Sequence, residues 1–322
     1  MATLSVVCPV FNEEFYIDAV IQFFLAAEPF DKELYVIDGG STDRTLEIVK
    51  QYTDVHANIK LLHNPEKYVP QALNKVIPLC KGTYIVRLDA HTGYDASYFT
   101  EIRETFERTG ASIVGGPMRA IGVSPTQKAI AYATSTPFGV GDSSFHYDDV
   151  EGEVDSVYLG AWKKSIFDKT GLFDEKFVRN QDDEFHYRAK SFGFKIWLNP
   201  KIKSHYYPRN NLTNLWRQYY QYGLYKPLVL SKIKNSIRLR HLIPSSLFLY
   251  LLLSPFIVAA GFLYSGLFLT LLLPMVLYLV LDFVYSFKCK EGLISQIKCM
   301  IVFPILHLSY GSGFLRGILK IV

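Results

Sequence analysis

The first half of the chain alternates short apolar runs with stretches of helical periodicity. Four apolar runs are short enough to be strands, and they cover residues 4–10, 34–37, 59–62 and 84–88. Helical periodicity follows each run, and the four helices are predicted to begin near Glu13, Asp43, Pro70 and Ala96. Strands that alternate with helices indicate a parallel sheet with right-handed crossovers, in which ligands bind beyond the carboxyl ends of the strands.

The alternation is less regular after residue 116, and a stretch rich in Gly, Ser and Asp covers 137–153. We predict a mobile loop there, because these residue types favour turns. Beyond this loop the pattern predicts, in order, a strand over 157–159, a helix around 164–169, a helix over 182–192 and a strand over 195–198. A long amphipathic helix through Trp216 and Tyr225 is expected to follow.

The last third of the chain is strongly apolar. Forty consecutive residues from Leu242 to Leu281 include no Asp, Glu, Lys or Arg, about twice the ~20 residues that a helix needs to cross a bilayer. Two spans fit this length better than the buried helical hairpin of a soluble protein. A further apolar run from Cys299 to Leu315 fits a third span, a re-entrant segment or an interfacial helix, and the sequence leaves these three open.

Composition and charge indicate a globular domain that meets a membrane. The 322 residues are 49% hydrophobic and 15% aromatic, which excludes a disordered chain, and the net charge is a modest +4. The basic residues directly before the apolar stretch form what we call the basic collar, namely Lys226, Lys232, Lys234, Arg238 and Arg240. Such a collar favours anionic lipid headgroups. We find no motif that reads bases, so we expect no nucleic acid partner.

Lysines also follow the second predicted span, at Lys288, Lys290 and Lys298. Because basic residues tend to remain on the cytoplasmic side, the hairpin is predicted to return to the side that it left. We therefore expect the chain in the inner, cytoplasmic membrane, with its amino-terminal domain in the cytoplasm.

Two strand ends offer polar and aromatic residues that suit a nucleotide. Pro9 and Phe11 can frame a flat base, while Glu13 can reach ribose hydroxyls. Asp38 closes the second strand and precedes two glycines, which let a ligand approach the backbone closely. A carboxylate at this position can accept the imide N–H of a uracil ring. An ordinary strand-to-helix turn explains the same residues without a ligand.

A third strand end carries Asp89 and His91, two residues apart. Side chains alternate along a strand, so both groups are predicted to point the same way at the strand tip. A carboxylate and a neutral imidazole suit Mn²⁺ or Mg²⁺ at a phosphate-handling site. Taken alone, the pair also fits a simple strand-end turn.

Acidic residues open the predicted helix that begins near residue 182. Asp182 and Asp183 are compatible with a solvated helix start, but they follow a Gly-rich, aromatic turn over 158–162 of the kind that forms a pocket wall. A carboxylate held there can act as a general base. Further along, Arg217 can clamp a diphosphate.

In this order and spacing, these motifs resemble glycosyltransferase family 2, the inverting enzymes with the GT-A fold. The resemblance covers about residues 3–225 and is strongest to membrane-bound exopolysaccharide glycosyltransferases of the succinoglycan type, whose carboxyl-terminal signature resembles 307–317. It implies an α/β fold: a GT-A catalytic domain with a Rossmann-like, mostly parallel sheet, followed by a carboxyl-terminal helical membrane region.

The resemblance also implies roles for individual residues. Asp38 takes the place of the family's nucleotide-binding aspartate, and Asp89 and His91 take the place of its metal motif. Asp182 becomes the catalytic base, with Asp183 as the alternative. The nucleotide-binding residues are then Pro9, Phe11, Glu13, Asp38, Lys67 and Arg217, and the metal ligands are Asp89, His91 and His205.

Three residues depart from the family pattern. Gly39, His91 and Gln181 each stand where the family often has an acidic residue. The first two look like variants of the exopolysaccharide subgroup. Gln181 removes a negative charge beside the expected base.

We predict a glycosyltransferase domain over 1–225, a basic juxtamembrane helix over 226–241, a transmembrane hairpin over 242–284 and a third apolar segment over 285–322. The implied reaction moves a sugar from a nucleotide-sugar donor, with UDP favoured, to a polyprenyl-diphosphate-linked sugar acceptor in exopolysaccharide or capsule synthesis. Two alternatives stay open. The acceptor can be polyprenyl phosphate itself, or the domain can be a non-catalytic scaffold that binds nucleotide sugars.

Overall fold

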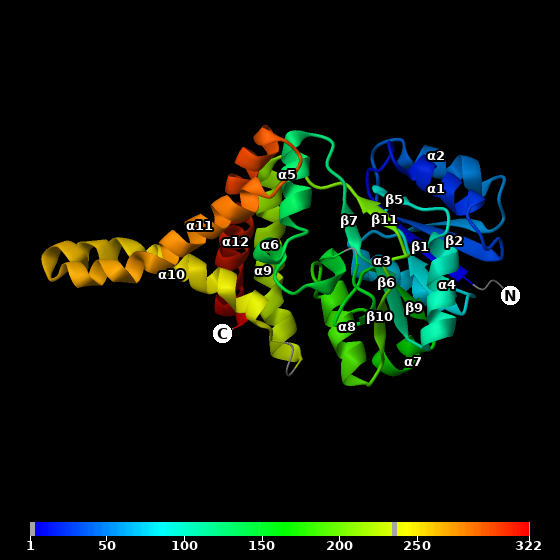
Figure 1. The fold of residues 1–322 in the computed structure, drawn as a ribbon. Helices are drawn as coiled ribbons and strands as arrows, with labels where there is room; N and C mark the ends of the chain where they lie inside the picture. The colour runs from blue at the N-terminus through cyan, green and yellow to red at the C-terminus, as the bar shows by residue number, and fades with distance from the viewer. Residues whose placement is uncertain (1–3, 148, 234–236, 322) are drawn as a thin grey trace. The chain divides into compact units, whose positions relative to one another are not determined.

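The computed structural model describes residues 4–147, 149–233 and 237–321, and its elements are labelled in Figure 1. The chain falls into two compact units: Met1–Arg119 with Ser144–Tyr206, and Ala120–Ser143 with Tyr207–Val322. A segment from the middle of the chain therefore belongs to the carboxyl-terminal unit. The domain borders expected at 225, 241 and 284 stay predictions, and the collar residue Lys234 lies outside the described residues.

The first unit is built on an eight-stranded sheet with the order β3-β2-β1-β4-β9-β6-β10-β8. Its strands are β1 (Leu4–Val10), β2 (Lys32–Asp38), β3 (Ile59–His63), β4 (Tyr84–Arg87), β6 (Ile113–Gly116), β8 (Gly152–Glu153), β9 (Tyr158–Lys163) and β10 (Ile196–Leu198). β3, β2, β1 and β4 run parallel. β9 runs antiparallel between β4 and β6, so the sheet is mixed. The α/β fold class that the sequence indicated is confirmed.

Two details of the sequence-based prediction were wrong. The stretch Tyr158–Lys163 is a strand inside the sheet, not a turn, and the Trp162 side chain is fully buried against Phe167, Phe173 and Phe185 instead of forming a pocket wall. The region predicted as one loop over 137–153 contains short regular elements, namely α6 (Pro137–Val140), a 3₁₀ turn (Ser144–His146) and β8.

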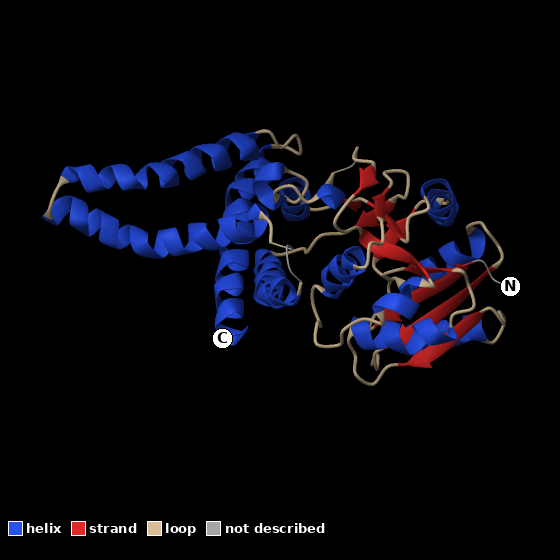
Figure 2. Cartoon of the chain, turned by 90° about the horizontal axis from the view of Figure 1, so that it is seen from below, coloured by secondary structure: helices blue, strands red, loops and turns tan. Residues whose placement is uncertain are grey.

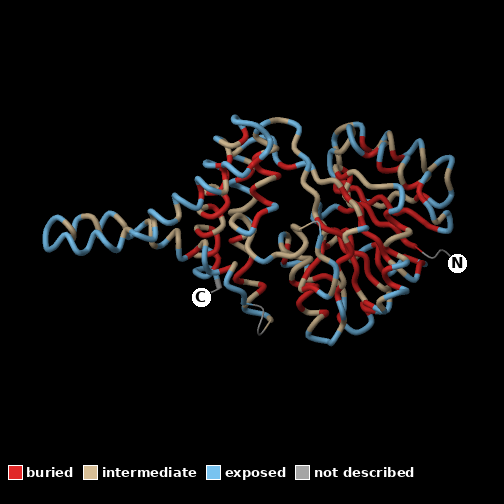
Figure 3. The backbone as a smooth tube through the Cα atoms, viewed as in Figure 1, coloured by how far each residue is buried: buried red, intermediate tan, exposed pale blue. Residues whose placement is uncertain are grey.

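Helices cover both faces of this sheet (Figure 2). They are α1 (Ile17–Ala26), α2 (Thr45–Thr53), α3 (Val69–Val76), α4 (Tyr98–Thr109), α7 (Ile166–Thr170) and α8 (Gln181–Ser191). Because side chains alternate along a strand, Val6 of β1 packs in a core with α1 and α4, while Val7 packs in a second core with α3 and α8. Figure 3 shows the buried strands between these helices.

A small second sheet has the order β5-β11-β7, formed by β5 (Thr92–Tyr94), β11 (Ser204–Tyr206) and β7 (Met118–Ala120). β5 directly follows the turn after β4, and it pairs antiparallel with β11. The chain segment just after Asp89 is therefore held in a sheet of its own.

The second unit is helical. Its elements are α5 (Pro125–Ala133), α6, α9 (Leu212–Lys232), α10 (Leu239–Leu263), a 3₁₀ segment (Gly266–Leu272), α11 (Leu273–Phe287) and α12 (Leu293–Ile321). Within the described residues, three stretches are long and apolar enough to cross a membrane: Leu239–Leu263, Gly266–Phe287 and Leu293–Lys320. The third apolar segment, which the sequence left open, is thus one continuous helix of spanning length.

Glycines on α9 and α12 explain the glycine-rich end of the sequence. A Cβ added to Gly223 would lie 2.1 Å from the carbonyl oxygen of Tyr310, and one added to Gly313 would lie 2.2 Å from that of Tyr220. The backbones of α9 and α12 therefore approach each other more closely than any larger residue allows. This packing buries more of α12 than of the other two candidate spans.

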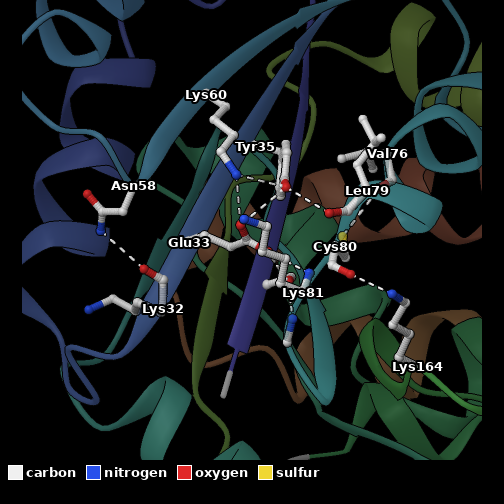
Figure 4. Close-up of polar contacts among 12 residues, drawn as sticks. Lys32, Glu33, Tyr35, Asn58, Lys60, Val76, Leu79, Cys80, Lys81 and Lys164 are labelled. Atoms are coloured by element: carbon white, nitrogen blue, oxygen red, sulfur yellow. Dashed lines mark hydrogen bonds and ion pairs between the residues drawn. The ribbon is translucent and has the colours of Figure 1, made fainter. Parts of the chain in front are cut away.

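Polar side chains form a hydrogen-bonded cluster at the amino ends of β1, β2 and β3, which Figure 4 shows. The buried Glu33 carboxylate accepts hydrogen bonds from Ser5 Oγ (2.7 Å), the Lys81 N–H (2.7 Å) and Lys60 Nζ (2.9 Å). Burial alone would raise the pKa of Glu33, but these donors, with the charge of Lys60, lower it below its ordinary value. The ionised form is therefore the one that the fold stabilises.

A lowered pKa means that Glu33 stabilises the fold above its ordinary pKa of 4.5 and that this contribution is lost as the pH falls through the folded-state pKa. We expect Glu33→Gln to cost about 1.5–3 kcal/mol at neutral pH, because a hydrogen-bonded charge is removed. The variant should also lose less stability than wild type on acidification below about pH 5. Thermal unfolding in detergent across this range measures both effects.

Glu47→Gln is the control, because Glu47 pairs with Arg44 at an exposed site, where an ion pair contributes little. Equal acid sensitivity of wild type and Glu33→Gln would contradict the role given to Glu33.

Candidate active site

Three neighbouring strands end at one edge of the large sheet. In the parallel register, Val10 at the end of β1 lies beside Asp38 at the end of β2, and Arg87 at the end of β4 lies beside Val7. The loops that follow β1, β2 and β4 therefore emerge together. This edge is where ligands of parallel α/β sheets bind.

The Asp38 carboxylate organises the loop after β2. It is 1% exposed, and its oxygens accept the N–H of Gly40 (2.8 Å) and of Ser41 (3.1 and 3.2 Å). Gly40 has a φ of 82°, a conformation that glycine adopts without strain. Asp38 thus shapes the turn, and its contact with a base stays a prediction.

The loop after β1 is tied to the loop after β2. Asn12 accepts the N–H of Thr42 (2.8 Å) through its side-chain oxygen, and the N–H of Glu13 donates to Thr45 Oγ1 (2.8 Å). Beside these loops, Lys67 Nζ lies 5.6 Å from the centroid of the Phe11 ring, which is about half exposed. Phe11 and Lys67, both predicted to bind nucleotide, therefore lie together, while Pro9 lies within β1.

Asp89 and His91 lie in the turn between β4 and β5, because β4 already ends at Arg87. The alternation of side chains along a strand, from which we predicted that Asp89 and His91 point the same way, therefore does not apply to them. His91 Nδ1 lies 3.1 Å from Glu13 Oε1. Tyr94 holds the backbone of Asp89 from both sides: its hydroxyl accepts the Asp89 N–H (2.7 Å) and donates to the Asp89 carbonyl (3.1 Å).

Arg87 joins the two carboxylates expected to bind metal and to act as base. Its Nε and Nη2 each lie 3.0 Å from Asp89 Oδ1, and its Nη1 lies 2.9 and 3.2 Å from the two Asp182 oxygens. Burial opposes the charge of Arg87, but Asp89 and Asp182 raise the pKa of the guanidinium above its ordinary value. Residues 95 positions apart in the chain thus meet at one cation.

The backbone is strained around this edge. Among the described residues, the non-glycine residues with positive φ are Asn12 (55°), Lys67 (68°), Leu159 (44°) and Asn180 (59°). Asn12 and Lys67 are in the loops just described, and Asn180 directly precedes α8 and Asp182. Strained residues of this kind concentrate at functional sites, where the surrounding structure holds them in place.

The remaining predicted residues lie on β11, α8 and α9. His205 is on β11, and its Nε2 lies 2.9 Å from Asp95 Oδ1. Asp183 follows Asp182 in the first turn of α8, and Arg217 is on α9 of the second unit. Across 4–147, 149–233 and 237–321, no three His, Cys, Asp or Glu side chains are grouped closely enough to hold a metal by themselves.

The charges and ligand types nevertheless suit a divalent cation that completes its shell with phosphate oxygens and water. Glu13, Asp89 and Asp182 contribute three carboxylates and Arg87 contributes one positive charge, beside the imidazole of His91. Magnesium-like ions commonly use one or two carboxylates together with substrate phosphates. The residues present therefore fit such an ion.

Sequence reasoning missed Arg87 and Tyr94, and it placed Tyr158 in a turn instead of at the start of β9. Tyr158 Oη lies 3.4 Å from Thr92 Oγ1, and burial next to Asp89 raises its pKa well above the ordinary value. For Arg87 a signal was available in the sequence, because a charged residue stands at the end of an apolar strand, shortly before the Asp-x-His pair.

Comparison with known sequences gives one family and several relatives. The family described as "Glycosyl transferase family 2" matches residues 5–170. The succinoglycan biosynthesis protein ExoA of Rhizobium meliloti is 31% identical over 74% of this chain and 73% of its own length. A dolichyl N-acetyl-α-D-glucosaminyl phosphate 3-β-D-2,3-diacetamido-2,3-dideoxy-β-D-glucuronosyltransferase of Methanococcus voltae is 29% identical over 99% of this chain and 98% of its own.

Two solved structures share the fold at low sequence identity. The mannosyltransferase PcManGT from Pyrobaculum calidifontis, in complex with GDP-Man and Mn²⁺, is 15% identical with a TM-score of 0.60, covering 95% of this chain and 87% of that one. Residues 1–349 of S. aureus TarS, in complex with UDP-GlcNAc, are 16% identical with a TM-score of 0.52, covering 96% and 91%.

Tyr94→Phe tests how the Asp89 turn is held. The substitution removes the hydroxyl that serves the N–H and carbonyl of Asp89, so we expect faster amide exchange over 88–94 and a loss of about 1–3 kcal/mol in unfolding free energy. Hydrogen exchange with mass spectrometry measures the first effect and thermal unfolding the second. Tyr52→Phe, which removes a bond to Asp18 on α1, should leave 88–94 unchanged. Wild-type exchange over 88–94 in Tyr94→Phe would contradict this role.

Proposed function

The chain belongs to glycosyl transferase family 2 and is a glycosyltransferase; from this premise we propose that it is an inverting enzyme that moves a sugar from a nucleotide-diphosphate sugar to a lipid-linked saccharide. One observation carries the proposal. The carboxylates of Asp89 and Asp182 both contact the Arg87 guanidinium. They lie at the edge of the sheet where β2 ends, at Asp38.

The donor side of the site is the pair of loops after β1 and β2. We propose that a uracil ring lies against Phe11 and Pro9, that Asp38 accepts its imide N–H, and that Glu13 binds the ribose. Lys67, next to the Phe11 ring, and Arg217 are the proposed partners of the diphosphate. Solved structures of this fold hold GDP-Man in one case and UDP-GlcNAc in another.

The proposed divalent cation is Mn²⁺ or Mg²⁺, held by Asp89 and His91 with His205 as a further ligand. When bound, the ion neutralises the charge that builds on the leaving diphosphate. Glu13 orients the His91 ring through its 3.1 Å contact, and Tyr94 fixes the backbone of Asp89. The related fold of the mannosyltransferase from Pyrobaculum calidifontis carries Mn²⁺.

Asp182 is the proposed general base, and Asp183 is the alternative. Asp182 takes the proton from the acceptor hydroxyl, which attacks the anomeric carbon from the face opposite to the leaving diphosphate, so the configuration inverts. Arg87 holds both oxygens of Asp182 and thereby fixes its direction in the first turn of α8.

For the acceptor we propose a saccharide on polyprenyl diphosphate, in the synthesis of an exopolysaccharide or capsule. Three helices of spanning length suit an acceptor whose lipid tail stays in the bilayer. One relative is named for a dolichyl-phosphate-linked acceptor and another for succinoglycan biosynthesis. We place the catalytic unit on the cytoplasmic side of the inner membrane, because the basic residues before the first span and after the second tend to remain on that side.

The test is a transfer assay with purified protein in detergent, using UDP- and GDP-linked sugars with Mn²⁺. Polyprenyl-diphosphate-linked saccharide and bare polyprenyl phosphate are offered separately. We expect transfer from a UDP-sugar to the lipid-linked saccharide, and Asp182→Asn should lower kcat by about 10²–10⁴-fold because the base is lost.

Asp168→Asn, an exposed substitution on α7, is the matched control and should keep wild-type kcat. A product on bare polyprenyl phosphate alone would replace the proposed acceptor. Full transfer by a folded Asp182→Asn variant would refute the assignment of the base.

A further inference from the structure

Arg87 contacts both carboxylates on which the proposed reaction depends. Its side chain is 7% exposed, whereas those of Asp89 and Asp182 are 21% and 30% exposed. The guanidinium therefore lies beneath the two carboxylates, on the side away from solvent. The more exposed parts of Asp89 and Asp182 remain accessible to a cation and an acceptor.

The guanidinium is attached to a rigid part of the fold. β4 pairs with β1 on one side and with β9 on the other, and the N–H of Leu88 donates to the Val7 carbonyl at 2.9 Å. An interior strand has little freedom to shift. The planar fork of arginine, with five donors, can serve two carboxylates at once, which the single ammonium of lysine does with less defined geometry.

The helix that carries Asp182 packs into the core through Phe185 and Ala189, and polar side chains hold another of its faces. Asp182, His186 and Lys190 are spaced four residues apart and therefore share one face of α8. His186 Nδ1 lies 2.8 Å from Ser156 Oγ, and Lys190 Nζ donates to Asp155 Oδ1 at 2.8 Å. In the first turn, Arg87 supplies the contact on this face. The direction of Asp182 thus depends on Arg87.

We propose that Arg87 is a positioning residue that fixes Asp182 relative to the cation ligand Asp89, so that the base and the cation share one rigid support. This role rests on the proposed function, because it needs Asp89 and Asp182 to have those tasks. Arg87 touches neither donor nor acceptor in this account. It acts through the two carboxylates and keeps their separation constant.

Arg87→Lys tests the role because it keeps the charge and loses the fork. We expect kcat to fall about 10- to 100-fold, as it does when a residue that orients ligands is lost and the reacting groups are misplaced. KM for the donor sugar should change less than about threefold. Electron paramagnetic resonance of Mn²⁺ alone should show about tenfold weaker binding. Amide exchange in the first turn of α8, residues 181–184, should become faster.

Arg188→Lys is the matched control. Arg188 is also a largely buried arginine on a carboxylate, Glu184, and on the carbonyls of Thr170 and Leu172, but it contacts neither Asp89 nor Asp182. We expect a lower Tm with unchanged Mn²⁺ binding and unchanged kcat for the folded fraction. If Arg87→Lys folds poorly, Arg87→Gln, which keeps amide donors, carries the same measurements.

The outcomes separate the two levels of the account. Wild-type Mn²⁺ binding, kcat and α8 exchange in a folded Arg87→Lys variant would overturn the positioning role and leave the glycosyl transfer intact. Absence of transfer by the wild-type protein with every donor would overturn the proposed function and, with it, the role of Arg87. A fall in Tm without the other three changes would show that Arg87 serves stability alone.

Discussion

A buried positive charge at the end of β4 determines where the first turn of α8 lies. Removing a guanidinium from water costs several kcal/mol unless carboxylates and hydrogen bonds compensate. Arg87 obtains that compensation from Asp89, two residues ahead, and from Asp182, 95 residues ahead. The first turn of α8 must therefore meet the carboxyl end of β4. Once it does, the Asp89 and Asp182 carboxylates lie together at the edge where three parallel strands end.

The two edges of the parallel strands serve different purposes. At the amino ends, the Glu33 carboxylate accepts hydrogen bonds from Ser5, Lys60 and Lys81, which stabilise that edge. At the carboxyl ends, non-glycine residues are held in left-handed conformations. Such strain costs about 1–3 kcal/mol per residue and persists only where the surroundings impose it. The stable amino-end edge and the two cores let the fold tolerate backbone strain at the carboxyl-end edge.

Local patterns were sufficient for the features that depend on local chemistry. β1 has the predicted bounds, and the long charge-free stretch became helices of spanning length. The polar loops after β1 and β2 were found because glycines and caps mark them in the sequence. Whether the assigned residues bind nucleotide or metal stays a prediction.

The misses have one physical cause, which is tertiary context. The stretch 158–163 contains Gly160 and two aromatic residues, a composition that favours a turn, but β4 and β6 pair with it on both sides and make it an interior strand. Arg87 escaped notice because its second partner comes from a distant helix. The third apolar segment could not be assigned because its packing depends on glycine contacts between α9 and α12.

The most direct measurement is an experimental structure of the protein with Mn²⁺ and UDP, in which the ion is located by anomalous scattering. The account predicts one Mn²⁺ at about 2 Å from an Asp89 oxygen, with the diphosphate on the ion and the uracil ring beside Phe11 and Asp38. An ion or nucleotide bound away from Asp89, with Asp182 facing neither, would contradict the central claim.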